Sequence, residues 1–159
     1  MTKLLLTLHV LAAVVTVGPV TVAAGMFPPS ARRALAAPGD ARALATVLTL
    51  HRICRVYAVV AVAVPVFGLA TANTMHVLGS PWLITSIALT VAAAAVLAAV
   101  MLPRQSALLA ALGDGERVQQ TGAVARAAGR LAVYTGMFNV LWATVTVLMV
   151  VRPGSTTGA

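Results

Sequence analysis

The sequence has 159 residues, of which 60% are hydrophobic and 9% are charged, whereas soluble domains carry roughly 25% charged residues. This small number of polar side chains could not cover the surface of a soluble domain. The composition therefore predicts an all-α integral membrane protein. The net charge of +8 would suggest a nucleic-acid partner in a soluble protein, but here it lies mostly in connecting segments, and no nucleic acid is expected.

Four apolar segments are long enough to cross a bilayer, which takes about 20 helical residues. They are residues 4–27, 56–73, 82–102 and 131–151. We therefore expect residues 1–155 to form one transmembrane domain, a four-helix bundle, with a disordered tail at 156–159. Pro28 and Pro29 are expected to end the first helix. Gly39-Asp40 should turn the chain and cap the next helix, and Gly113 to Glu116 should begin the approach to the fourth span.

The basic residues predict the orientation of the chain. Most of them lie in the two long connections, and Lys3 and Arg152 lie near the termini. The residues in the connections are Arg32, Arg33, Arg42, Arg52, Arg55, Arg104, Arg117, Arg126 and Arg130. Positively charged loops stay in the cytoplasm, so both termini and the turn at His76 should be extracytoplasmic. The arginines should then meet anionic lipids at the cytoplasmic face. A cleaved signal peptide at the N-terminus is the alternative, because Lys3 precedes the first apolar run.

Short matches indicate an internal repeat. Met26-Phe27-Pro28 recurs as Met101-Leu102-Pro103, and Arg55 corresponds to Arg130. Each half would contain two spans and enter the membrane in the same direction, which predicts two tandem helical hairpins.

The fourth span carries a polar stripe. Thr135, Asn139, Trp142 and Thr146 follow one another at helical spacing. Polar residues at membrane depth usually face the bundle interior, so this stripe should point inward, for hydrogen bonds between helices or as a wall facing a ligand. Pro19 and Pro65 can kink their helices, and small residues such as Gly68 permit close helix contact.

Two histidines share the predicted outer side. His9 lies within the first span and His76 just beyond the second. Neutral imidazole binds haem iron or copper, and two histidines from different helices could hold a haem b between them. The alternative is that neither histidine binds a cofactor: His9 would be hydrogen-bonded within the bundle, and His76 would be solvated in its turn. His51 belongs to the opposite end and is not expected to join them.

The stretch "LLLTLHVLAAVVTVGP", with a histidine early in the first span and a glycine near its middle, resembles a family of small bacterial four-helix integral membrane proteins of unknown function. More distantly it is similar to the membrane region of copper-resistance D-type proteins. The resemblance implies the four-helix fold and a histidine ligand at His9. Thr16 and Pro19 depart from the commoner pattern, in which tryptophan and paired glycine often occupy these places.

No hydrolase or nucleotide-binding motif occurs, so we expect no enzyme. The leading hypothesis is an accessory or assembly factor of a respiratory or metal-handling system, in a membrane complex or homo-oligomer. The alternatives are a haem b or copper protein using His9 and His76, and a small transporter. Composition suggests a multi-pass protein of a bacterial plasma membrane.

Overall fold

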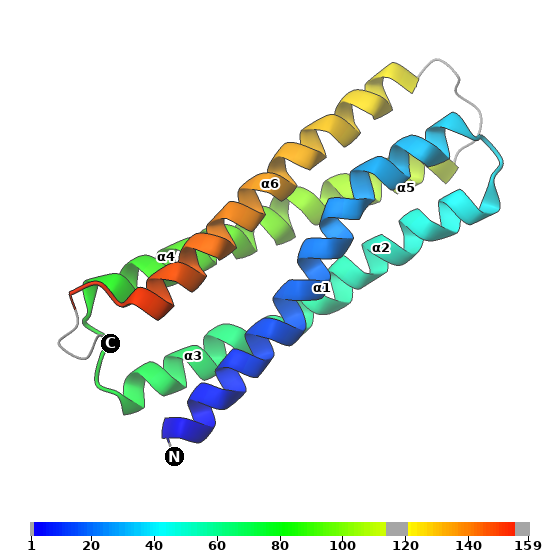
Figure 1. Cartoon of the computed structure of the whole chain (residues 1–159). Helices are drawn as coiled ribbons and strands as arrows, with labels where there is room; N and C mark the ends of the chain where they lie inside the picture. Colours follow the sequence, from blue (N-terminus) through cyan, green and yellow to red (C-terminus); the bar gives the residue numbers. More distant parts are fainter. Residues whose placement is uncertain (1, 114–120, 155–159) are drawn as a thin grey trace.

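A computed structural model describes residues 2–113 and 121–154 of the chain. Within these residues all regular structure is helical, as the composition predicts (Figure 1). The elements are α1 (Thr2–Ala36), α2 (Ala41–Val60), α3 (Ala63–Thr74), α4 (Pro81–Ala95), the π-helical turn η1 (Val96–Met101), α5 (Leu102–Gly113) and α6 (Thr121–Val151). They form four helical rods that are long and apolar enough to cross a membrane, which confirms the four-span bundle.

The four rods pair as two hairpins in chain order. α1 packs along α2 and α3, and the rod formed by α4, η1 and α5 packs along α6. The two pairs meet where α1 contacts α6 and α2 contacts α5 (Figure 1). This arrangement agrees with the tandem hairpins that the repeat predicts.

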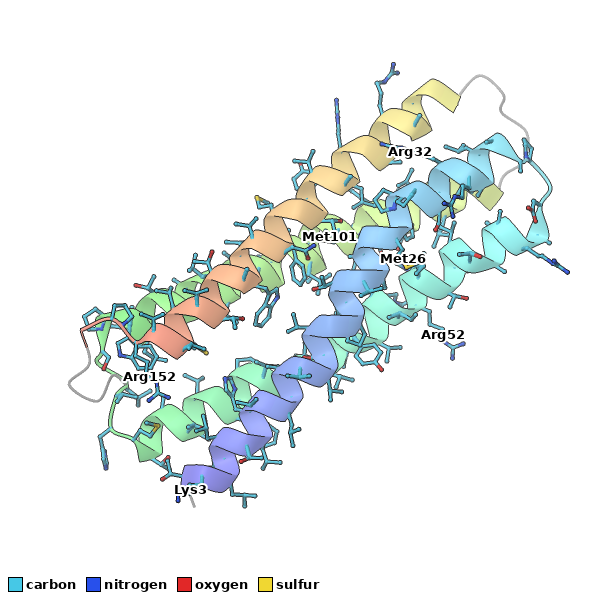
Figure 2. The ribbon with its side chains drawn as sticks, viewed as in Figure 1. Lys3, Met26, Arg32, Arg52, Met101 and Arg152 are labelled. Carbon is cyan, nitrogen blue, oxygen red and sulfur yellow. The ribbon has the colours of Figure 1, made fainter. Side chains whose placement is uncertain are left out.

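The two ends of the bundle differ in charge. The start of α1, the turn between α3 and α4 and the end of α6 lie together, and Figure 2 shows Lys3 and Arg152 at this end. We call it the terminal end. Arg32 and Arg52 lie toward the opposite end, where α1 connects to α2. We call that the arginine-rich end.

The spans are longer than the apolar segments predict, and the prediction that Pro28 and Pro29 end the first helix is wrong. α1 continues through both prolines to Ala36. Each proline lacks an N–H and so leaves the carbonyl four residues earlier without its helical donor. The Thr135 hydroxyl of α6 lies 3.5 Å from the Ala24 carbonyl that Pro28 leaves free. Membrane helices tolerate proline where a neighbouring helix supplies such a donor.

Two other prolines do interrupt their helices. Pro65 cannot donate to Ala61, whose carbonyl instead accepts from the Val64 N–H at 3.0 Å, and α2 and α3 are separated at this point. Pro103 follows η1, in which the Leu102 N–H reaches back to the Leu97 carbonyl. Proline is a recognised cause of such local changes in helix geometry.

The connection after α1 forms as the sequence predicts. Gly39 takes the left-handed backbone conformation, with φ of 85°. Asp40 then caps α2, and its side chain accepts hydrogen bonds from the Arg42 N–H at 2.9 Å and the Ala43 N–H at 3.2 Å. The predicted helix start that includes Asp114 and Glu116, and the predicted tail at 156–159, lie outside the described residues.

The core lies where the two hairpins meet. Its largest buried side chains come from both halves, and they are Phe27, Met101, Leu131, Phe138, Val20 and Val47. Apolar side chains elsewhere on the spans are exposed, as is normal where lipid is the solvent.

Candidate functional site

His9 lies in the contact between α1 and α3. The residue is 9% exposed, and its Nδ1 lies 2.8 Å from the Val64 carbonyl oxygen. A carbonyl can only accept, so Nδ1 must carry the proton and donate it. In the neutral ring this leaves Nε2 unprotonated, with a lone pair available to a ligand or a hydrogen-bond donor.

Gly68 makes room for the His9 ring. A Cβ atom at this position would lie 2.8 Å from His9 Cε1 and 3.1 Å from His9 Nδ1. Real Cβ atoms do not approach other atoms so closely, so any side chain here would have to displace the imidazole. The close contact between α1 and α3 therefore depends on glycine.

No hydrogen bond joins His76 to His9 within the described part of the chain. It lies in the turn after α3, is exposed, and has a φ of 55°. His9 touches α3 at Gly68, and α3 continues to Thr74, about 9 Å farther along its axis at 1.5 Å per residue. Because His76 lies beyond the end of this helix, the two imidazoles are separated along α3.

The predicted polar stripe on α6 is only partly inside the bundle. Thr135 is buried, and its hydroxyl lies 3.0 Å from the Leu131 carbonyl and 3.5 Å from the Ala24 carbonyl. The two carbonyl oxygens therefore share one hydroxyl donor. Asn139 is half-buried, and its Oδ1 has no hydrogen-bond partner within the described part of the chain. Trp142 is half-buried and packs edge-on against Phe138, with ring centroids 6.3 Å apart.

Thr146, the last member of that stripe, is exposed and does not face inward. Its hydroxyl donates to the Trp142 carbonyl at 2.9 Å, so it needs no partner from another helix. Val145 fills the adjacent interior position and is 2% exposed.

A second buried polar group, which the sequence pattern did not predict, lies at the arginine-rich end. The His51 Nδ1 of α2 lies 3.0 Å from the Gln105 Oε1 of α5, and the Gln105 amide donates to Cys54 Sγ at 3.7 Å. Ser106 Oγ lies 3.3 Å from His51 Nε2. Gln105 and Cys54 are fully buried. This group, which we call the His51–Gln105 tie, fastens the first hairpin to the second.

A sequence signal for this tie exists. Gln105 continues the helical spacing of Met101 and Leu108, and all three are buried. His51 and Cys54 lie three positions apart on α2, close to buried Leu50. Gln105 directly follows Arg104, in a segment that the charges mark as a basic connection. The helical spacing of its apolar neighbours nevertheless indicates that it is buried.

Two comparisons with known proteins find nothing similar, and one finds a family. Residues 3–153 match the family described as "Predicted integral membrane protein (DUF2269)". No curated protein and no solved structure matches the chain.

Proposed function

Because the chain belongs to the DUF2269 family of predicted integral membrane proteins, we propose that it is a non-enzymatic accessory protein of a respiratory or metal-handling system, with His9 as a single imidazole ligand for haem b. The membrane we assign to it is the bacterial plasma membrane. The observation that carries the proposal is the hydrogen bond from His9 Nδ1 to the Val64 carbonyl.

That hydrogen bond would hold the ring with Nε2 free to act as a ligand. Histidines that bind metals almost always donate their second ring N–H to a carbonyl or carboxylate, which fixes the tautomer and strengthens the other nitrogen as a ligand. His9 has this arrangement, with Nε2 as the unprotonated nitrogen. Gly68 restricts the position of the ring. Neutral imidazole is a common axial ligand of haem iron.

The residues fit a single axial bond better than the pair expected from the sequence. His76 is exposed in its turn and lies beyond the end of α3, so we do not assign it as the second ligand.

Copper fits the residues less well than haem. Protein copper sites use several soft or imidazole ligands around one ion. Within residues 2–113 and 121–154 no three His, Cys, Asp or Glu side chains are grouped so that they could hold a metal ion. We therefore favour haem, which supplies four of its own nitrogen ligands and takes only axial bonds from the protein.

An absorption spectrum tests this function. The full chain is expressed in haem-replete bacteria and purified in mild detergent, beside His9→Ala, His76→Ala and His51→Ala. We expect a Soret band in the wild type and in the His76 and His51 variants, and its loss in His9→Ala. Free imidazole should restore the band to His9→Ala, which separates loss of the ligand from misfolding. A colourless wild type, or an unchanged band in His9→Ala, would contradict the proposal.

A further inference from the structure

A groove at the arginine-rich end runs between α5 and α6. Its volume is about 440 Å³, within the range of roughly 300 to 1,000 Å³ typical of ligand sites. Three of its lining residues are arginines and the others are small or apolar, namely Arg104, Ala107, Leu108, Ala111, Ala123, Arg126, Ala127 and Arg130. We call it the α5–α6 groove.

The three guanidinium groups come from both walls of the groove. Arg104 lies on α5, and Arg126 and Arg130 lie one helical turn apart on α6. Arg104 is held against the ring of Tyr134, with its Cζ 4.1 Å from the ring centroid, a cation–π contact. The Arg104 guanidinium is therefore positioned before any ligand binds.

The charge of the groove is not neutralised by carboxylates that the structure describes. No salt bridge forms among the described residues, and Asp40, the one acidic residue among them, caps α2 instead. A fourth arginine adds to the field, because the Nη2 of Arg32 on α1 lies 3.5 Å from the Cβ position of Gly129, next to Arg130 in sequence. Such a field attracts anions.

We propose that the α5–α6 groove binds the headgroup of a membrane lipid that carries two phosphates. Guanidinium groups bind phosphate oxygens in a bidentate manner, and three of them are better neutralised by two phosphates than by one. The alanines of the groove leave space for the phosphates to approach the helices. Basic pockets between membrane helices are known to bind lipid headgroups of this type.

A lipid is the occupant, rather than a soluble anion, because of where the groove begins. Arg104 lies two residues after the apolar run of residues 82–102, and Arg130 directly precedes the apolar part of α6. Tyr134 is an aromatic residue of the kind that lies at the membrane interface. A headgroup between these arginines would have its acyl chains beside the apolar spans.

Native mass spectrometry of the full chain in detergent tests the proposal. The probes are diphosphatidylglycerol, phosphatidylglycerol and inorganic pyrophosphate. We expect diphosphatidylglycerol to bind at least about tenfold more tightly than either of the others. Each arginine near a membrane surface raises the affinity for an anionic lipid about fivefold. Equal binding of pyrophosphate would overturn the assignment to a lipid. Equal binding of phosphatidylglycerol would overturn the assignment of two phosphates.

Matched triple variants test the location. R104Q/R126Q/R130Q removes the arginines of the groove, and R42Q/R52Q/R55Q removes three exposed arginines of α2. The groove variant should lose the preference for diphosphatidylglycerol by about tenfold or more, and the α2 variant should keep it. Equal losses would show an effect of total charge and overturn the site. If the groove variant does not fold, Arg126→Gln alone should weaken binding about fivefold, and unchanged binding would overturn the site.

Discussion

His9 occupies the space that Gly68 leaves open, since a Cβ on Gly68 would lie 2.8 Å from His9 Cε1. The same imidazole donates to the carbonyl of Val64, one helical turn earlier on α3. The part of the second span nearer the terminal end is thus attached to α1 by one side chain, which is hydrogen-bonded and closely packed. This relationship allows a direct test by substitution.

Gly68→Ala should destabilise the protein by about 1 to 3 kcal/mol, because the new methyl group displaces a buried, hydrogen-bonded ring. Unfolding in detergent measures this difference. Gly136→Ala is the control, because nothing lies within 4 Å of a Cβ there, and alanine should stabilise that helix by about 0.5 to 1 kcal/mol. In a His9→Ala background the cost of Gly68→Ala should fall. Identical effects of the two glycine substitutions would contradict the contact.

Gln105→Met tests the His51–Gln105 tie. Methionine keeps the shape of the buried side chain but removes the oxygen that lies 3.0 Å from His51 Nδ1. An unsatisfied buried donor should cost about 1 to 3 kcal/mol of unfolding free energy, measured by the same assay. Ser106→Ala, at an exposed residue, should cost less than about 1 kcal/mol. If Gln105→Met left the free energy of unfolding unchanged, the tie would not fasten the hairpins.

Asp40→Ala should weaken the start of α2. The side chain of Asp40 accepts from two backbone N–H groups that otherwise have no helical partner. Loss of such a cap costs about 1 kcal/mol, whereas Asp40→Asn keeps an acceptor and should cost little. Amide hydrogen exchange at Arg42 and Ala43 reports the change directly. Equal exchange in the alanine and asparagine variants would argue against capping.

Cysteine labelling tests the orientation expected from the arginines. Native Cys54 is fully buried and should not react in the folded protein, so it provides the background. In whole cells a membrane-impermeant maleimide should label His76→Cys and should not label Arg42→Cys, because the two lie at opposite ends of the bundle. The reverse pattern would place the arginine-rich end outside and contradict the charge rule.

The sequence predicts the number of spans and their pairing well, because length and apolarity leave few alternatives in a bilayer. Helix ends are less predictable. Pro28 and Pro29 read locally as a stop, but Thr135, more than a hundred residues away in sequence, reaches the carbonyl that Pro28 leaves free. Local patterns cannot supply a donor from another helix.

The candidate site is also only partly predictable from the sequence. The sequence identifies His9 as an unusual residue, but not its partner, because a backbone carbonyl carries no signal in side-chain patterns. It groups His9 with His76 because both lie toward one side, and the helix between them separates the two along its axis. Gln105 directly follows Arg104 of the basic connection, so the sequence does not single it out, although its apolar neighbours have helical spacing.

The pairing of α1 with α2 and α3, and of the α4–α5 rod with α6, has a consequence for biosynthesis. Each rod finds its main partner next to it in the chain, so the first hairpin can close while the ribosome is still translating the second. The contacts of α1 and α2 with α5 must wait until α5 has been made, and those of α1 with α6 form last. A truncated chain that stops before Pro81 should therefore insert and pair its two spans without the rest.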